Sequence, residues 1–307
     1  MANEIYHSSG GLSDLRVAAV LAAEVQRLIA DVFSLWNHPA FPLVGDVAGT
    51  NSNVIDQPQA GLDGYDIMAS VAENASSSNT ALTDASPSIT VSRQSLQRQL
   101  ADLFRLTGTG NQDIDRLAVD MVFAALGRGQ ELICNVGDDF TTQKGSTGTD
   151  MSTDDWFDSQ FALTQASVAA ELACLYPTQL TDLQNSLRGE AGPIQFVDDT
   201  QAMMNQMGQG YAGRLNGVPI FSSTHVPTAN GGSDSAGFMC GAGAIGRAIG
   251  TPKPIRGAGE VILPAGSLIQ CELERDASGG LTKIVGNAWM GVAVLLDGAG
   301  VSIITDR

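Results

Sequence analysis

The chain has 307 residues, of which 43% are apolar, 16% are charged and 35 are glycine, and its formal net charge is −17. This length is enough for one large domain or two intertwined ones with a sizeable core. The glycine content favours an α+β fold over a helical bundle. Only 16 residues are Lys or Arg, and they form no cluster. Because phosphate neutralisation supplies most of the affinity for nucleic acid, we expect no direct nucleic-acid binding.

The first predicted element is an amphipathic helix over residues 13–36. Its apolar residues repeat at helical spacing, namely Leu21, Val25, Leu28, Val32 and Trp36. Glu24, Arg27 and Asp31 interrupt the apolar stretch at residues 17–36. We therefore expect neither a signal peptide nor a membrane span, and a chain that stays in the cytoplasm. A helix with such a stripe at a chain end must dock on its own body or on a neighbour.

Residues 43–90 contain no Lys or Arg. Short β-like runs at Tyr65–Val71 and Ile89–Val91 predict a long hairpin with a polar tip at residues 73–84. Such a tip buries little of itself, so it predicts an outward-reaching arm or a disordered loop. Together with the leading helix, this arm is an unfinished surface that sister molecules would complete.

Four further helices and a C-terminal sheet are predicted downstream. The helices lie at residues 93–106, 113–135, 153–175 and 177–188, with a Gly/Thr/Ser loop at 137–150. The helix at 113–135 spans roughly 30 Å and would be the backbone of the main domain. Strands are predicted at 218–222, 260–263, 268–275, 281–285, 289–296 and 301–305, with hairpin turns at Ser278–Gly280 and Asp297–Gly298. The chain should therefore end in an antiparallel sheet that packs on the long helix.

Residues Gly241-Ala242-Gly243-Ala244-Ile245-Gly246 fit the nucleotide-binding pattern G-x-G-x-x-G. A nucleotide site of this kind needs a long helix directly after the turn. Pro252 and Pro254 leave room for barely a turn and a half. Close backbone packing is therefore the better interpretation of these glycines, and no cofactor is expected.

Other residues with chemical potential also have structural interpretations. Three acidic doublets, Asp138-Asp139, Asp154-Asp155 and Asp198-Asp199, fit solvated or helix-capping roles, because adjacent side chains point apart. His225 fits a hydrogen-bonded loop residue better than a catalytic base. The cysteines fit buried free thiols better than zinc ligands or disulfide partners: Cys134, Cys174, Cys240 and Cys271. We predict no catalytic, cofactor-binding or metal-binding residue, and no enzymatic activity.

Three segments resemble the major capsid proteins of tailed bacteriophages, which have the Hong Kong 97 fold. Residues 210–220, GYAGRLNGVPI, with 221–227 after them, are similar to the family's "G-x-L-x-G-x-P-V, then S-x-x-V-P" stretch. Residues 174–187, CLYPTQLTDLQNSL, resemble its "P-x-x-L-x-x-L" helix, and residues 286–306 resemble its closing strand pair. With the arm and the long helix upstream, the resemblance covers nearly the whole chain.

The resemblance implies an α+β fold of the Hong Kong 97 type in four parts. These are an N-terminal arm (1–42), an extended loop hairpin (43–92), a peripheral domain of long spine helix plus antiparallel sheet (93–175 and 256–307), and an axial domain (176–255). It implies a major capsid protein whose pentamers and hexamers form an icosahedral head shell around double-stranded DNA in the virion. The implied partners are copies of itself, a portal, optionally a decoration protein, and packaged DNA held without specific binding, with no membrane. The chain lacks the N-terminal extension of family members with a built-in scaffold, so we expect a separate scaffolding protein or a form already trimmed.

Some family members cross-link covalently through a lysine in the extended loop. Residues 43–92 contain no lysine, so a shell held by non-covalent contacts is expected. Two alternatives remain open. An encapsulin-like nanocompartment would share the fold, whereas a soluble hydrolase or oxidoreductase would require His225 or the glycine motif to be active.

Overall fold

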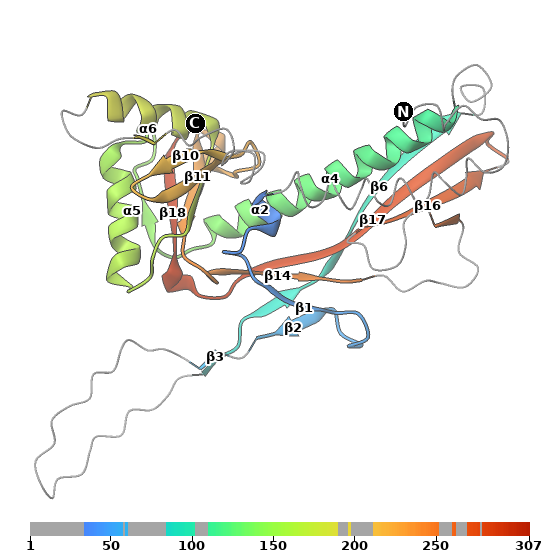
Figure 1. Ribbon diagram of the computed structural model, residues 1–307, viewed down its shortest axis with the longest axis horizontal. Helices are drawn as coiled ribbons and strands as arrows, with labels where there is room; N and C mark the ends of the chain where they lie inside the picture. Colours follow the sequence, from blue (N-terminus) through green and yellow to red (C-terminus); the bar gives the residue numbers. More distant parts are fainter. Residues whose placement is uncertain are drawn as a thin grey trace, which may run out of the picture.

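The computed structural model describes residues 34–57, 59–60, 84–101, 110–189, 196–197, 211–251, 260–261, 269–276 and 278–307. The leading helix predicted over residues 13–36 lies outside these ranges except for its last turn, α2 (Ser34–Asn37). The polar tip predicted at residues 73–84 lies outside them except for its final residue. The described part is a mixed α+β structure with two large sheets, as expected from the composition (Figure 1).

The first sheet, here called the long sheet, runs in the order β1-β14-β17-β16-β15, with β6 also paired to β17. Its strands are β1 (Leu43–Asp46), β6 (Ser92–Ala101), β14 (Ile245–Ile249), β15 (Glu260–Val261), β16 (Ile269–Asp276) and β17 (Leu281–Val294). The long helix α4 (Gly110–Asp138) lies along this sheet (Figure 1). It confirms the helix predicted at 113–135 and extends it at both ends.

The second sheet, here called the mixed sheet, has parallel and antiparallel pairs in the order β7-β18-β13-β8-β11-β10-β9. Its strands are β7 (Gln143–Lys144), β8 (Leu172–Leu175), β9 (Phe196–Val197), β10 (Tyr211–Leu215), β11 (Val218–Ser222), β13 (Asp234–Cys240) and β18 (Gly300–Asp306), and β12 (Thr228–Ala229) pairs with β13. Helices α5 (Thr153–Gln165) and α6 (Pro177–Gly189) lie beside it, at the left of Figure 1. We call this sheet with α5 and α6 the mixed-sheet lobe.

The base of the predicted loop hairpin packs against the long sheet. Two short ladders form it: β2 (Val54–Asp56) with β5 (Ser88–Thr90), and β3 (Gln59–Ala60) with β4 (Asp84–Ala85). The run at 89–91 was expected to pair with the run at 65–71, but the partner of Ile89 is Ile55. In this pairing Ile89 is fully buried and packs with Ala248 and Leu295. This apolar packing stabilises the short two-stranded ladder. Residues 65–71 lie outside the described residues.

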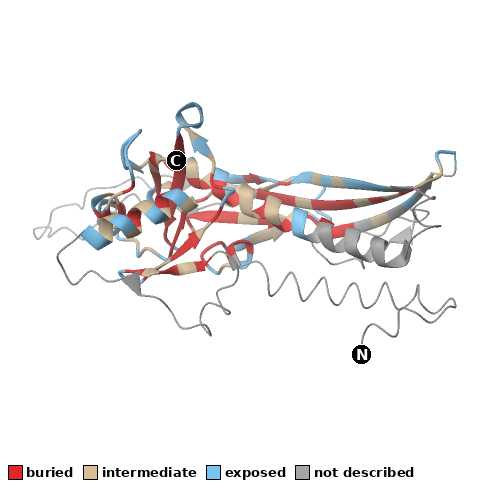
Figure 2. Cartoon of the chain, turned by 90° about the horizontal axis from the view of Figure 1, so that it is seen from above, coloured by how far each residue is buried: buried red, intermediate tan, exposed pale blue. Residues whose placement is uncertain are grey.

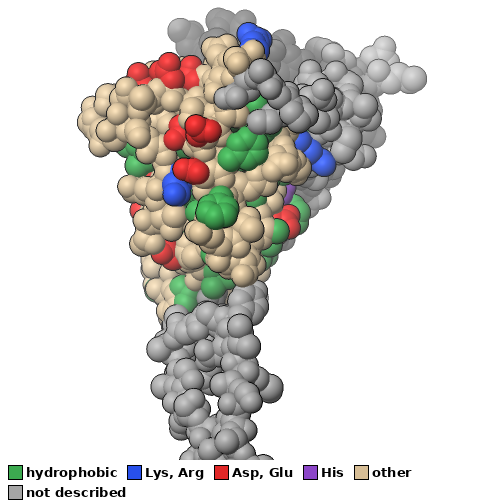
Figure 3. Space-filling model, turned by 90° about the vertical axis from the view of Figure 1, so that its left-hand side faces the viewer, with side chains coloured by type: hydrophobic (Ala, Val, Ile, Leu, Met, Phe, Trp, Pro, Cys, Tyr) green, Lys and Arg blue, Asp and Glu red, His purple; other side chains and the backbone are tan. Residues whose placement is uncertain are grey.

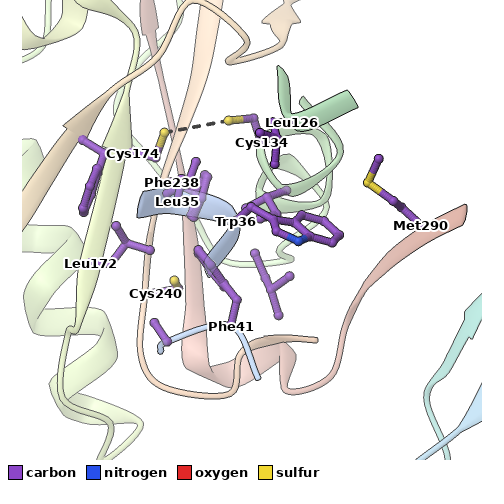
Figure 4. Close-up of a cluster of buried hydrophobic side chains, with 14 of the residues drawn as sticks. Leu35, Trp36, Phe41, Leu126, Cys134, Leu172, Cys174, Phe238, Cys240 and Met290 are labelled. Carbon is purple, nitrogen blue, oxygen red and sulfur yellow. Dashed lines mark hydrogen bonds between the residues drawn. The ribbon is translucent and has the colours of Figure 1, made fainter. Parts of the chain in front are cut away.

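The core joins α2, α4 and both sheets. Leu35, Trp36 and Phe41 pack with Leu126 of α4 and Phe238 of β13 (Figure 4). Buried residues gather in the mixed-sheet lobe and under α4, whereas the far ends of the long strands are more exposed (Figure 2). The described end of the leading segment therefore docks on the chain's own body.

Two helix predictions need correction at their ends. The helix predicted at 153–175 ends at Gln165, and Leu172–Leu175 form the fully buried strand β8. Ser167 adopts a positive φ of 59° there, which is incompatible with helix continuation. Four consecutive apolar residues fit a central strand covered on both faces. The helix predicted at 177–188 is confirmed as α6, which extends one residue further, to Gly189.

The helix predicted at 93–106 is wrong. Residues 92–101 form strand β6, which pairs with β17 over ten residues without a break. Arg, Gln and Leu favour helix locally, but this propensity is worth only tenths of a kcal/mol per residue. A continuous ladder with a strand nearly 200 residues away outweighs it, as tertiary context commonly does.

The C-terminal strands do not form one sheet. The runs predicted at 281–285 and 289–296 are a single strand, β17, and the Ser278–Gly280 turn to β16 is confirmed. The Asp297–Gly298 segment is not a hairpin turn; it is a short 3₁₀ helix, η3 (Asp297–Ala299), that passes from the long sheet to the mixed sheet. Strand β18 then inserts between β13 and β7.

Sheet membership divides the chain differently from the expected domain boundaries. Helix α5 and strands β8 and β18, expected in the peripheral part, lie with the mixed sheet. Strand β14, expected in the axial part, lies in the long sheet. The chain crosses between the two sheets several times.

Candidate assembly surface

Helix α5 begins with a capping box. The Ser152 side chain accepts a hydrogen bond from the Asp155 backbone N–H (3.2 Å), and Asp155 Oδ2 accepts one from the Ser152 N–H (3.0 Å). Of the solvated or capping roles predicted for the Asp154-Asp155 doublet, Asp155 has the capping role and Asp154 is exposed. The capped helix turns Trp156, Ser159 and Leu163 into the core.

The opposite side of α5 carries an exposed aromatic ring. Phe161 has 59% of its surface exposed, the largest value among the exposed large hydrophobic side chains of the described residues. Asp154 and Asp158 are exposed on the same helix. Figure 3 faces this end of the molecule and shows hydrophobic side chains beside acidic ones.

The surrounding chain is acidic. Residues 138–189 contain eight Asp or Glu against two Lys or Arg. Partial burial, and then the charges of Asp150 and Asp306, raise the pKa of Asp182 above its ordinary value. Burial, followed by the neighbouring Asp139, also raises the pKa of Asp138, although a hydrogen bond from Ser302 opposes it. This excess of negative charge disfavours phosphate-bearing partners on the lobe.

The Asp138-Asp139 doublet does not form a paired-carboxylate site. Asp138 accepts a hydrogen bond from Ser302 Oγ (3.3 Å), whereas Asp139 is exposed at the end of α4. These positions fit the solvated role predicted for the doublet. The third doublet, Asp198-Asp199, lies outside the described residues.

The glycine motif is a packing feature. Residues 241–244 link β13 to β14, and no helix follows them in the described segment up to residue 251. A Cβ on Gly241 would lie 2.2 Å from Val168 Cγ1, and one on Gly246 would lie 2.5 Å from Leu295 Cδ1. Gly243 has a φ of 75°, which favours glycine. The close-packing interpretation is confirmed.

His225 is an exposed residue in the loop between β11 and β12. Its backbone N–H donates to Ser223 Oγ (3.1 Å). This hydrogen bond orders the loop. It fits the prediction that His225 is a hydrogen-bonded loop residue.

Three cysteines meet in the core. Cys134, Cys174 and Cys240 are buried and free, and the Sγ atoms of Cys134 and Cys174 are 3.8 Å apart (Figure 4). The thiol contact with Cys134, together with burial, raises the pKa of Cys174 well above its ordinary value, and burial raises that of Cys240. Neutral thiols of this kind pack as small apolar groups. The side chain of Cys271 lies outside the described residues.

Within the described ranges, no group of three or more His, Cys, Asp or Glu side chains is arranged to hold a metal ion. None of the described helices has the length and apolar character needed to cross a bilayer. Sequence reasoning did not single out Phe161. The helical spacing could have indicated its exposure. Trp156, Ser159 and Leu163 lie on one face of α5, and Phe161 lies on the opposite face.

No protein-family model matches this chain, and no curated protein matches it either. Several solved structures do match it. A structure of Mycobacterium phage Che8 aligns with a TM-score of 0.59 at 14% identity, over 88% of this chain and 90% of that one. The holo-SrpI encapsulin complex from Synechococcus elongatus gives 0.58 at 13%, over 86% and 85%. The capsid of Cyanophage P-SCSP1u gives 0.53 at 13%, over 87% of each chain.

These alignments span nearly the full length of both partners, so they compare whole folds rather than one shared motif. The chain therefore has the fold of these phage and encapsulin structures. This confirms the α+β capsid-type fold that the sequence resemblance predicted.

Proposed function

We propose that this chain is the major capsid protein of a tailed bacteriophage. Its pentamers and hexamers form the icosahedral head shell that encloses the double-stranded DNA genome in the virion. The observation that carries the proposal is the whole-chain fold similarity to capsid structures, including the cyanophage capsid at 87% coverage of both chains. We further propose that the protein is structural rather than enzymatic.

The long sheet supports this proposal physically. The even-numbered residues of β17 from Thr282 to Met290 are buried, and a Cβ on Gly286 would lie 3.0 Å from Met121 of α4. On the other face, Lys283 and Val285 stay partly exposed. Around these residues, the described part of the region is two layers thick, and α4 covers one of its two faces (Figure 1). A thin extended unit of this kind gains stability when neighbours cover its open face.

The four-part division is proposed with boundaries adjusted to the sheets. Residues 1–42 form the N-terminal arm and residues 43–92 the extended loop. The long sheet with α4 forms the peripheral domain, and the mixed-sheet lobe forms the axial domain that meets its copies at the symmetry axes. Sheet membership supports moving α5, β8 and β18 into the axial domain.

The proposed partners are further copies of this chain, a portal, a separate scaffolding protein unless the chain is a trimmed form, and optionally a decoration protein. The negative charge supports a lining that holds packaged DNA without specific contacts, because a basic lining would bind the phosphates.

Light scattering and electron microscopy of the purified protein test the assembly. We expect megadalton icosahedral particles, or discrete pentamers and hexamers when no scaffolding protein is present. A protein that stays monomeric across salt and concentration series would contradict the proposal.

An encapsulin-like compartment is the second candidate, because the encapsulin alignment has a TM-score of 0.58, close to the 0.59 of the phage structure. The cargo separates the two functions. Particles isolated from their natural source should contain genomic double-stranded DNA if the chain is a phage capsid protein, and a protein cargo if it is an encapsulin.

A further inference from the structure

We propose that Asn216 is a site of spontaneous modification. The backbone nitrogen of Gly217 attacks the Asn216 side-chain amide, releases ammonia and leaves a carboxylate in the turn. The reaction needs water but no enzyme or cofactor. It goes beyond the proposed function and does not depend on it, because every protein group that reacts belongs to one chain.

Asn216 and Gly217 are the two central residues of the turn between β10 and β11 (Figure 1). Both have a positive φ, 51° and 84°, as the favoured two-residue hairpin turns require. Both are also exposed, and Leu215 pairs with Val218 directly beside them. Water therefore reaches the reacting groups, whereas the strands on either side hold the ends of the turn.

The reaction balances within the turn and the solvent. Hydroxide removes the proton of the Gly217 backbone N–H, and the nitrogen then bonds to Asn216 Cγ. The Cγ–Nδ2 bond breaks, and the departing nitrogen takes up a proton from water and leaves as ammonia. A second water opens the cyclic imide that has formed. Opening at one carbonyl gives aspartate, and opening at the other gives isoaspartate, whose backbone runs through the former side chain.

Gly217 permits this attack because it has no side chain. No heavy atom lies within 4 Å of the position that its Cβ would occupy, so the nitrogen can turn toward Asn216 Cγ without a collision. Glycine also adopts either sign of φ at little cost, which eases this rotation. Asn287 has neither advantage, because it is buried in β17 and alanine follows it.

One side-chain hydrogen bond opposes the rotation. Asn216 Nδ2 donates to Gln160 Oε1 of α5 (2.8 Å), and this bond must break before the amide can turn toward Gly217. Asn216 is exposed and Gln160 is half-buried, so water competes for both partners. Opening of the turn is therefore a local event that leaves the two strands paired.

The chain has one other Asn-Gly pair, Asn230-Gly231, which provides an internal comparison. These two residues are also exposed and have a positive φ, 49° and 71°. Their turn is held by more contacts. Asn230 Nδ2 donates to the carboxylate of Asp234, which is only 1% exposed, and the Asn230 carbonyl accepts a hydrogen bond from Ser233 Oγ (3.0 Å). Because a carboxylate holds a donor more strongly than a neutral amide does, we expect Asn216 to react first.

The two products affect the hairpin differently. Aspartate keeps the backbone and adds one negative charge to a lobe that is already acidic. Isoaspartate lengthens the backbone inside a turn whose flanking residues, Leu215 and Val218, are buried. The pairing of β10 with β11 cannot keep its register across a longer turn, so this product should destabilise the lobe.

Incubation of the purified protein at neutral to alkaline pH, followed by peptide mass spectrometry, tests the proposal. The peptide that contains Asn216 should gain the mass difference between an amide and a carboxylate. The rate should rise with pH, because hydroxide activates the Gly217 nitrogen. In water enriched in heavy oxygen the product should carry the label, since the new oxygen comes from solvent. The peptide that contains Asn230 should react more slowly, by about fivefold or more.

Two variants test the role of the hydrogen bond. Gln160→Ala removes the acceptor of Asn216 Nδ2 and should speed the conversion about two- to fivefold. Gln165→Ala makes the same change at an exposed position of α5 outside this contact, so its rate should equal that of the wild type. Thermal unfolding of freshly purified protein checks that both variants fold.

Three results would overturn the proposal. The first is an intact Asn216 amide in the protein while a synthetic peptide of residues 211–222 is converted. The others are a faster reaction at Asn230 and a rate that does not change with pH. Equal rates for Gln160→Ala and the wild type would overturn the role of the hydrogen bond. The capsid function is tested separately by light scattering and microscopy, so failure of either proposal is recognised independently of the other.

Discussion

At the scale of single residues, one buried glutamine connects α6 to the mixed sheet. Gln179 is fully buried, and its Oε1 accepts the Tyr176 N–H (3.0 Å). Its Nε2 donates to the Ser235 and Ile303 carbonyls and to Thr305 Oγ1, at 2.8–3.1 Å. Every polar atom of the side chain is satisfied, so the network orients the helix on strands β13 and β18.

Gln179→Leu keeps the size of the side chain but leaves buried donors and acceptors without partners. We expect it to lower the free energy of unfolding by about 2 kcal/mol or more. Gln165→Leu, the same change at an exposed position of α5, should stay within about 0.5 kcal/mol. Urea unfolding of both variants measures this, and equal stabilities would contradict the role of the network.

His38 makes stability depend on pH. Its Nδ1 accepts the Ala40 N–H (3.2 Å), and its ring packs against Phe41 and Phe221. Burial lowers the pKa of His38 below 6.5, with Glu171 opposing the shift. The unfolded chain therefore takes up this proton at a higher pH than the folded chain. The stability from the neutral ring is present above about pH 6.5 and is lost as pH falls through the lowered pKa.

His38→Asn retains a nearby acceptor but cannot take up the proton. Between pH 8 and pH 5, the wild type should lose more stability than this variant, measured by urea unfolding in the same assembly state. His225→Asn, at an exposed loop position, is the matched control and should keep the pH dependence of the wild type. The same slope in all three proteins would show that His38 is not the sensor.

At the scale of elements, α4 joins the two sheets because its last turns come very close to β13. A Cβ on Gly137 would lie 2.2 Å from Phe238 Cδ1, in the core of the molecule. The absence of a side chain there lets the helix touch the mixed sheet while its earlier turns cover the long sheet. The relative placement of the sheets therefore depends on this contact.

Gly137→Ala measures the contact. Alanine improves helix propensity by about 1 kcal/mol, but the collision with Phe238 should outweigh this gain and destabilise the protein by about 1–3 kcal/mol. Gly189→Ala lies at the end of α6 with no heavy atom near the new Cβ, so it should be neutral or stabilising. Chemical denaturation compares them, and a stabilising Gly137→Ala would refute the close-contact argument.

At the scale of the whole molecule, the sources of cohesion are non-covalent. The described cysteines are buried in one core, and Lys283 pairs with Asp276 of the same hairpin (3.3 Å). The extended loop has no lysine from which a covalent link to a neighbour could start. We therefore expect the proposed shell to be held together by burial and hydrogen bonds.

Boiling purified particles in SDS without reductant should therefore return a single band at the monomer mass of 31.9 kDa. The reason is that the described cysteines are buried and the extended loop contains no lysine. A ladder of multimers that survives boiling would contradict this prediction. Mass spectrometry of the monomer band, which should show no linked peptides, is the control for incomplete entry into the gel.

Local patterns in the sequence predicted the elements whose information lies within a few residues. Helices α4 and α6, the Ser278–Gly280 turn and the capping role of Asp155 follow from periodicity, caps and turn chemistry. The close-packing interpretation of the glycine motif also came from local evidence, because two prolines limit any helix after it.

Tertiary structure alone decided the features that depend on distant partners. Strand β6 has helix-forming residues. It is nevertheless a strand, because it pairs with β17 along its whole length, starting with Ser92 opposite Met290. Strand β18 belongs to the mixed sheet because β13 offers it a full-length edge. Cys134 and Cys174 meet only after α4 and β8 pack together. Local propensity is worth tenths of a kcal/mol per residue, whereas sheet pairing and core burial are worth several kcal/mol per element, so the distant contacts prevail.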